Sequence, residues 1–281
     1  MTQIDKSRFE WIGSDSARRE GISRPSTTFW KDAIGRLMKN KVAVVCFFII
    51  VLLILSCIIV PFFSPFESRE QHLGEVNKGF MTVCTDSRYE GQHHVHYFGT
   101  DNLGRDLFLR AFEGGRVSLM IAFAAVFVNL IVGLIYGGIS GYIGGAVDTI
   151  MMRIVEIVNG IPYLIVVILL MMVLPKGIFT MVVAYGITGW TGMARLVRGQ
   201  VLQLKSQEYI VAAEAMGAKS SRIIAKHLIP NALSVIIINV TLAIPSAIFT
   251  EAFLSYIGLG VPVPQPSWGV LAKGGQDVFM T

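Results

Sequence analysis

The residues of this chain that could do chemistry lie outside its long apolar runs. His93, His94 and His96 stand close to Asp86 and Glu90, and alternate residues share one face of an extended chain. Imidazole and carboxylate groups are ligands for divalent transition metals. An exposed polar loop is the competing interpretation of such a stretch, and we favour it and predict no metal in this chain.

Sequence signatures of catalysis are absent. The chain contains no GxxxxGK[ST] phosphate-binding loop, no GxSxG nucleophile elbow and no HExxH zinc motif. The polar groups inside the apolar runs are too scattered to pair an acid with a base. We therefore expect a protein that is not an enzyme and that binds no cofactor of its own.

The composition is that of a multi-pass membrane protein. Of 281 residues, 53% are hydrophobic and 15% are charged, whereas charged residues make up about a quarter of a soluble domain. The net charge of +5 comes from basic residues that gather beside apolar runs, as the positive-inside rule describes. The lipid bilayer accounts for this charge, and we predict no nucleic-acid partner.

The N-terminal half of the chain predicts an arm, a span and an insertion. Residues 1–41 carry nine Lys or Arg against five Asp or Glu, which places the N-terminus in the cytoplasm. Helical spacing of apolar residues near residue 30 predicts a short amphipathic helix on the membrane surface, with an ordinary flank as the alternative. Residues 42–60 form a charge-free first span that Pro61 ends, and residues 61–116 form an extracytoplasmic insertion.

Residues 117–281 predict an all-α core with four more spans. We expect a second span at 117–140, a glycine-rich inner turn at 141–148, a third span up to Pro175, a fourth at 178–194 and a fifth at 228–250, interrupted by Pro245. The prolines at 262, 264 and 266 exclude a continuous helix and predict a re-entrant or external segment. The C-terminus then lies outside after five spans.

A polar segment, residues 206–230, separates two apolar runs with the sequence SQEYIVAAEAMGAKSSRIIAKHLIP. We predict one short helix capped by Ser206 and ended by left-handed Gly217, and a second that Ser220 or Ser221 caps and Pro230 stops. Helices of this length are unstable alone in water and need a docking surface.

Three interpretations of the polar segment compete. Ile210 with Ala213 and Ala212 with Met216 recur at helical spacing and form a side of small and apolar groups. That side could pack on the chain's own spans. A DNA-reading helix-turn-helix is disfavoured because both ends are tethered to the membrane. We favour docking to a cytoplasmic partner.

The residues of the polar segment also carry a family resemblance. The stretch VAAEAMG, nine residues and HLIP resemble the coupling motif of ABC importer permeases, with Ala212, Ala213, Gly217 and Pro230 in register. Val211 stands where the motif has Glu, and Glu208 or Glu214 can substitute for that charge. His227 and Ile229 replace the motif's Ile and Leu.

Two further stretches are similar to the C-type permease subunit of oligopeptide and dipeptide importers. They are residues 98–119, FGTDNLGRDLFLRAFEGGRVSL, and EAFLSYIGLG followed by PSWG within residues 251–269. The resemblance implies a type I importer fold, with a sixth span expected after the five visible here. It also implies a second permease, two cytoplasmic ATPases that hold ATP and Mg²⁺, and an external peptide-binding protein.

From these observations we predict a permease subunit for short peptides in the plasma membrane. Nickel, glutathione or another small solute is the alternative cargo, and a stand-alone secondary transporter or a membrane scaffold is the alternative class. The residues expected to couple to the ATPases are Glu208, Ala212, Ala213, Glu214, Gly217, Arg222 and Pro230. Polar residues inside spans, which could line the path or bond between helices, are Asn129, Asn239, Thr241, Ser246 and Glu251.

Overall fold

The computed structural model describes residues 29–85 and 94–280. Contacts divide the chain into two units, residues 1–53 and 54–281. The first unit holds α1 (Phe29–Lys39) and most of α2 (Lys41–Phe63). The predicted short helix near residue 30 is confirmed as α1, and Asp32 and Arg36 form an ion pair of 2.8 Å on its surface.

Helix α2 covers the first predicted span. Its 23 residues are almost wholly apolar and long enough to cross a membrane. The predicted end at residue 60 is wrong, because α2 continues for three more residues through Pro61 to Phe63. The proline removes one backbone hydrogen bond, but Ser64 N still donates to Val60 O at 3.1 Å and closes a last turn.

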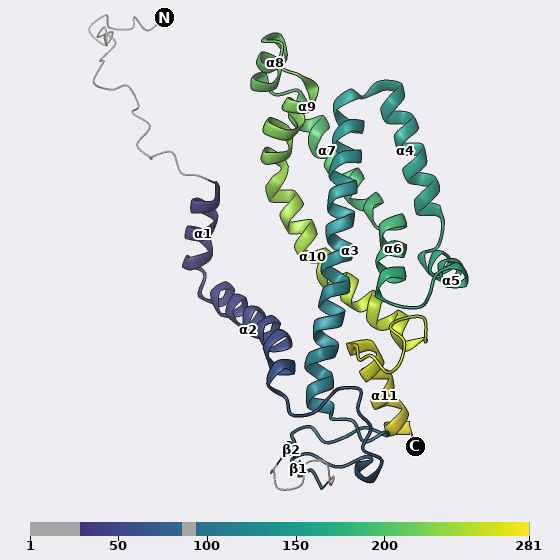
Figure 1. Cartoon of the computed structure of the whole chain (residues 1–281). Helices are drawn as coiled ribbons and strands as arrows, with labels where there is room; N and C mark the ends of the chain where they lie inside the picture. The colour runs from purple at the N-terminus through teal and green to yellow at the C-terminus, as the bar shows by residue number, and fades with distance from the viewer. Residues whose placement is uncertain (1–28, 86–93, 281) are drawn as a thin grey trace, which may run out of the picture. The chain divides into compact units, whose positions relative to one another are not determined.

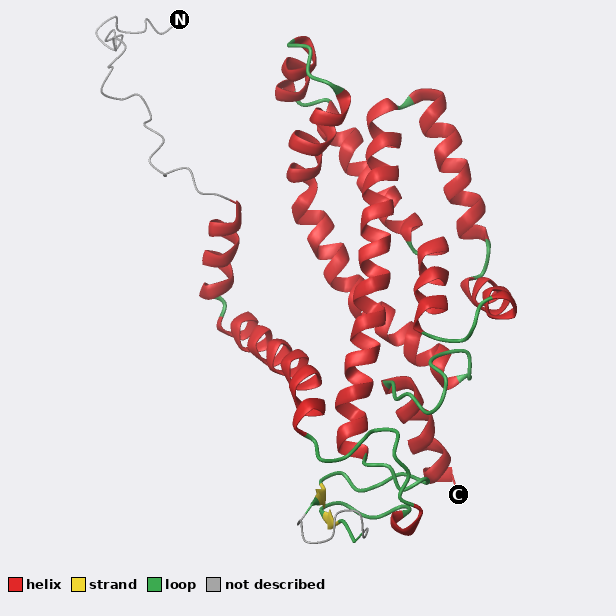
Figure 2. Cartoon of the chain, viewed as in Figure 1, coloured by secondary structure: helices red, strands yellow, loops and turns green. Residues whose placement is uncertain are grey.

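The second unit is a set of helices packed around the long helix α3, with a small folded insertion at one end (Figures 1 and 2). The insertion contains η3 (Leu73–Glu75) and the antiparallel pair β1 (Thr82–Val83) and β2 (Val95–His96). The helices are α3 (Leu107–Ile143), α4 (Gly145–Gly160), α5 (Tyr163–Val173), α6 (Ile178–Thr188), α7 (Trp190–Lys205), α8 (Glu208–Ala215), α9 (Ser220–Ile223), the π-helical turn η5 (Ile224–Leu228), α10 (Ile229–Tyr256) and α11 (Trp268–Met280).

Helix α3 begins earlier than the sequence predicts. Asp106 accepts a hydrogen bond from Leu109 N at 2.7 Å and so caps the helix. Residues 107–116, which we assigned to the insertion, are therefore helical. The predicted inner turn at 141–148 is also shorter, because only Gly144, with φ of 71°, separates α3 from α4.

A stripe of glycines lets α7 approach α3 closely. Gly133, Gly137 and Gly141 recur every four residues on α3 and face α7. A Cβ atom on Gly137 would lie 2.3 Å from Ala194 O. The small residues therefore permit the close approach that the sequence predicts.

Two predicted spans are broken in the structure. The third bends by 78° between α4 and α5, because Pro162 forces Ile161 into an extended conformation. The fourth divides at Gly189 into α6 and α7, and α7 runs on to Lys205 instead of ending near residue 194.

The first helix of the C-terminal part, α10, is more continuous than the sequence predicts. The predicted interruption at Pro245 is wrong, because α10 continues through it. Residues 257–267 are not helical, as the three prolines predict, and α11 follows them. In the described part of the chain, three helices are long and apolar enough to cross a membrane, or four if the bent pair α4 and α5 counts as one.

Candidate functional site

The polar segment lies at the end of the second unit opposite the insertion (Figure 1). Gly217 has φ of 80° and ends α8 in the left-handed conformation, as predicted. The predicted caps are wrong. Ser206 Oγ donates to Gln203 O at 3.1 Å, while Gln207 precedes α8 and Lys219 precedes α9, neither with a capping side chain.

Pro230 does not stop the second helix of the polar segment. The chain is helical without a break from Ser220 to Tyr256. The π-helical turn η5 comes just before Pro230, which falls in the first turn of α10. The wider π-helical turn shifts the hydrogen-bond pattern, so the helix accommodates a residue without an N–H. The polar segment is thus continuous with α10.

One side of α8 packs on the chain's own helices. Ile210 is fully buried and Ala213 is 6% exposed. Ile210 lies in a core cluster with Val201 of α7 and Leu228 of η5. The interpretation that the polar segment folds on its own spans is therefore confirmed for this side.

The other side of the segment faces outward. Val211 is 55% exposed and Met216 is 82% exposed, and Ala212 and Gly217, which follow them in the chain, are also exposed. We call these four residues the outer face. The remaining predicted coupling residues Glu208, Glu214, Arg222 and Pro230 are also exposed. The segment thus presents small and apolar groups that no part of this described chain covers.

Two residues that the sequence did not single out attach the polar segment to α3. Tyr142, in the last turn of α3, donates its hydroxyl to Glu214 Oε1 at 3.0 Å. Lys205, the last residue of α7, donates from Nζ to Tyr142 O at 2.5 Å. Glu214 and Tyr142 are 72 residues apart in the sequence, so no local pattern announces the contact.

A second polar contact joins α3, α4 and α7 near the same end. Arg198 Nε and Nη2 each bond to the Asp148 carboxylate at 2.5 Å, in a bidentate pair. Ser140 Oγ donates to the same carboxylate at 2.5 Å. Asp148 and Arg198 are separated by 50 residues, and sequence reasoning missed this pair as well.

The predicted path residues do not form one group. Asn129 is half-buried on α3 against Gly189, at the break between α6 and α7, and its Oδ1 has no hydrogen-bond partner among the described residues. Asn239 and Ser246 are seven residues apart and share a face of α10. Thr241 points elsewhere and donates its hydroxyl to Ile237 O at 2.8 Å.

Glu251 bonds between helices, which is one of the two roles considered for it from the sequence. Its side chain is fully buried. Ser118 Oγ of α3 and Ser255 Oγ each donate to its carboxylate at 2.7 Å. Trp268 N, at the start of α11, donates to Ser118 Oγ at 3.2 Å. Because a buried carboxylate needs such partners, Glu251 joins three helices instead of lining a path.

The structure places His96 in a cluster different from the predicted one, with Glu75 and Asp106. Asp86, Glu90 and His93 lie outside the described residues, and His94 is half-buried. His96 is fully buried between two carboxylates. Its Nδ1 bonds to Asp106 Oδ1 at 2.7 Å and its Nε2 to Glu75 Oε2 at 3.0 Å.

The two carboxylates favour the charged form of His96. Burial alone would lower the pKa of His96, but the hydrogen bonds and charges of Asp106 and Glu75 outweigh burial and raise it. Burial would raise the pKa of Glu75, yet hydrogen bonds from Thr85, Cys84 and His96 lower it to about 2. The insertion is thus joined to the start of α3 by paired buried charges.

The fold defines a multi-pass helical membrane protein with an exposed polar segment at one end. Residues 131–280 match the family model of the binding-protein-dependent transport system inner membrane component. Residues 28–79 match the N-terminal TM domain of oligopeptide transport permease C. The chain belongs to the family of binding-protein-dependent transport system inner membrane components.

Full-length relatives support the assignment. The chain is 48% identical to the oligopeptide transport system permease protein OppC of Bacillus subtilis (strain 168), over 98% of this chain and 86% of that protein. It is 47% identical to the dipeptide transport system permease protein DppC of the same organism, over 93% and 78%. Identity to OppC of Escherichia coli (strain K12) is 42%, over 98% and 86%.

A solved structure shares the fold. It is the MetNI methionine ABC transporter in inward-facing conformations, with a TM-score of 0.50 and 20% sequence identity. The match covers 59% of this chain and 79% of that chain. This likeness concerns the arrangement of helices alone.

Proposed function

We propose that this chain is the membrane permease subunit of an ATP-driven importer of short peptides. The names of its relatives over nearly its whole length support the cargo. The observation that carries the coupling role is the two-sided polar segment. One side is buried in the core of the same helices that would move, and the outer face is exposed with small side chains that let another protein approach closely.

The partners follow from what the sequence lacks. Without a phosphate-binding loop, ATP and Mg²⁺ belong to two cytoplasmic ATPases that dock on the outer face. A second, related permease completes the path across the bilayer. An external binding protein delivers peptide at the end that carries the insertion. The arm before α1 lies in the cytoplasm because of its basic residues, and the type I fold adds a sixth span to the five expected.

The buried side of the segment offers a route for mechanical coupling. Ile210 packs against residues of α7 and η5, and Glu214 bonds to Tyr142 of α3. A displacement of α8 by the ATPases therefore pushes on three elements of the packed core. Packed helices have discrete arrangements, so the push shifts the importer between inward and outward openings.

Replacement of an outer-face residue tests this function. Gly217 is unsuitable, because any L side chain at its φ of 80° is strained, so Ala212→Trp is the better variant. In vesicles that hold the complete importer, we expect ATP-dependent uptake of a labelled peptide to fall at least about tenfold, which corresponds to about 1.4 kcal/mol. The ATPases should also co-purify less.

The matched control is Ala146→Trp, at an exposed position of α4 near the same end of the second unit. It should leave both measurements near those of the unchanged protein. Normal uptake by Ala212→Trp, at a normal membrane level, would show that the outer face does not couple transport.

A further inference from the structure

Three buried residues of the insertion bring potential metal ligands together. Glu75, Cys84 and His96 each offer one ligand atom, and these atoms lie within 4.8 Å of one another. Cys84 Sγ is 3.2 Å and His96 Nε2 is 3.0 Å from Glu75 Oε2. The exposed fractions of the residues are 2%, 9% and 0%, in chain order. They come from η3, the residue after β1, and β2.

Two of the three separations are close to those around a tetrahedral ion, and the third, between Cys84 Sγ and His96 Nε2, is within 4.8 Å. Bonds of about 2.0 Å to nitrogen or oxygen and about 2.3 Å to sulfur hold the ligand atoms about 3.3–3.5 Å apart. The two separations from Glu75 Oε2, 3.0 and 3.2 Å, therefore need to widen by about 0.3 Å each. Small rotations of the side chains can make this change while the backbone stays in place.

Neighbouring residues already orient the three ligands. Asp106 bonds to Nδ1 of His96, so Nε2 is the nitrogen aimed at the cluster. This is the carboxylate–histidine arrangement found behind many metal ions. Thr85 donates to Glu75 Oε1 from its backbone N and from its hydroxyl, which leaves Oε2 directed at Cys84 and His96.

We propose that Glu75, Cys84 and His96 form a binding site for one divalent transition metal of the zinc class, which holds the insertion together. Nitrogen, thiolate and carboxylate donors suit zinc or cobalt, whereas magnesium and calcium require oxygen donors. On binding, the ion replaces the protons shared among the three groups, and these protons pass to water. Water completes the fourth position.

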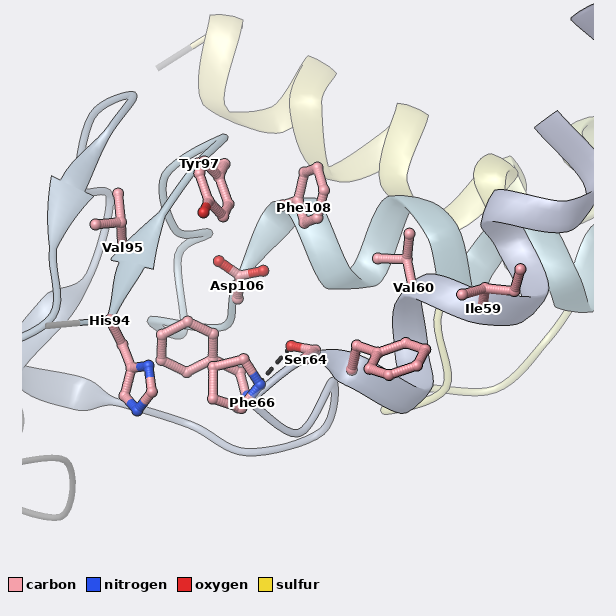
Figure 3. A pocket seen from close by; sticks show the side chains of 11 residues that line it. Ile59, Val60, Ser64, Phe66, His94, Val95, Tyr97, Asp106 and Phe108 are labelled. Carbon is pink, nitrogen blue, oxygen red and sulfur yellow. Dashed lines mark hydrogen bonds between the residues drawn. The ribbon is translucent and has the colours of Figure 1, made fainter. Parts of the chain in front are cut away.

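A pocket of about 340 Å³ lies beside the cluster and is lined by two residues that contact His96, Phe66 and Asp106. Figure 3 shows Phe66, His94 and Asp106 among the side chains that line it. The Phe66 ring stacks on His96, with ring centroids 4.4 Å apart. Phe66 and Asp106 therefore separate the pocket from His96.

This site differs from the one considered from the sequence. His96 is the residue shared with the three-histidine cluster, and its companions lie 21 residues before it, at Glu75, and in Cys84. From the sequence we predicted that the chain binds no metal, and we now propose a metal site instead.

Cobalt titration of the purified full-length chain, after treatment with chelator and reductant, tests the site. We expect one Co²⁺ per chain, a near-ultraviolet cobalt–thiolate band, and displacement of Co²⁺ by Zn²⁺. Cys84→Ser should abolish the band, and His96→Gln should weaken binding by at least about 10–100-fold. Cys46→Ser, at an exposed cysteine of α2, is the matched control and should keep the band.

Thermal unfolding keeps the test decisive where a variant folds poorly. Zn²⁺ should raise the Tm of the unchanged protein and of Cys46→Ser, and a chelator should reverse the rise. A folded, unchanged chain that binds no Co²⁺, or a thiolate band that survives in Cys84→Ser, would overturn the proposal. Neither readout depends on transport, so the site can fail while the permease function stands.

Discussion

The two ends of the second unit satisfy their polar groups in opposite ways. At the insertion, His96 lies fully buried between Glu75 and Asp106, and the charges pair within the chain. At the polar segment, only one side of α8 is buried, and Met216 on the outer face is 82% exposed. The charges of the insertion end pair within the chain, whereas the outer face of the segment end is covered by none of the described residues.

The difference separates what each end contributes. Buried charge pairs are costly to break, because the remaining charge stays in a poorly solvated place. Exposed apolar groups contribute little to the stability of the chain and much to association. Substitutions at the insertion should therefore act on folding, and substitutions on the outer face should act on coupling.

The largest effect is expected from Asp106→Ala. This change removes the acceptor of His96 Nδ1 and the cap of α3 in one step. We expect the free energy of unfolding to fall by about 3–5 kcal/mol, as for other broken buried pairs. Limited proteolysis of the insertion and the thermal unfolding midpoint of the metal-free protein measure it.

Asp106→Asn is the matched control for that variant. Its single side-chain oxygen can still accept a hydrogen bond from Leu109 N and keep the cap of α3, while its NH2 group faces His96 Nδ1, where both the acceptor and the charge are lost. The loss should be clearly smaller than with alanine. Equal stability of Asp106→Ala and the unchanged protein would show that the insertion end is not held by these charges.

Gly137→Val is expected to have the next largest effect. A Cβ atom there would lie 2.3 Å from Ala194 O, so α7 must move away from α3. Overpacking of this kind costs about 1–3 kcal/mol, measured as a lower midpoint of thermal unfolding in detergent. Gly199→Ala on α7, where a Cβ meets nothing within 4 Å, should not lower the midpoint.

Because α7 and α3 carry the polar segment, Gly137→Val also sharpens the comparison between the two ends. We expect protease sensitivity to rise near the polar segment and to stay unchanged at the insertion. Uniform loosening of both ends would contradict the idea that they are stabilised separately.

Met216→Ser should change coupling without changing stability. The side chain is 82% exposed, so the free energy of unfolding should shift by less than about 0.5 kcal/mol. ATPase co-purification and peptide uptake should both fall, because an apolar contact at the proposed interface is lost. Ile210→Ala, on the buried side of the same helix, should instead lower stability by about 2–5 kcal/mol.

Hydropathy was a sufficient guide to the long helices but not to their breaks. Charge-free runs identify α2, α3 and α10, because a span must be apolar along its length. The break at Gly189 has no strong signal. Gly189 keeps a helix-like conformation, and its Cα packs against the Asn129 side chain, 60 residues earlier in the sequence. Pro162 did signal a break, and its effect on the residue before it was overlooked.

The candidate sites also include features that a local sequence pattern predicts and features that depend on residues distant in the sequence. Gly217 was predictable, because a left-handed helix end is a local property of glycine. The burial of Glu251 was not, since its partner Ser118 lies 133 residues away. The cluster of Glu75, Cys84 and His96 depends on the pairing of β1 with β2, and two-residue strands leave almost no pattern in the sequence.

The smallest predicted effect concerns the contact that ties the segment to α3. Tyr142→Phe removes the hydroxyl that donates to Glu214 Oε1 at 3.0 Å and leaves the ring in place. A single exposed hydrogen bond contributes about 0.5–1.5 kcal/mol, so the chain should stay folded and the ATPases should remain attached. If the contact transmits motion, the number of peptides imported per ATP hydrolysed should fall by up to about tenfold.

Glu214→Gln distinguishes the hydrogen bond from the charge. The glutamine oxygen can still accept from Tyr142, so this variant should import peptide at the normal ratio to ATP. A normal ratio in Tyr142→Phe as well would mean that the segment moves α3 only through its apolar side, where Ile210 meets Val201 and Leu228. In that case the segment end would depend on apolar packing for its coupling, and the insertion end would be the part of the chain organised by polar contacts.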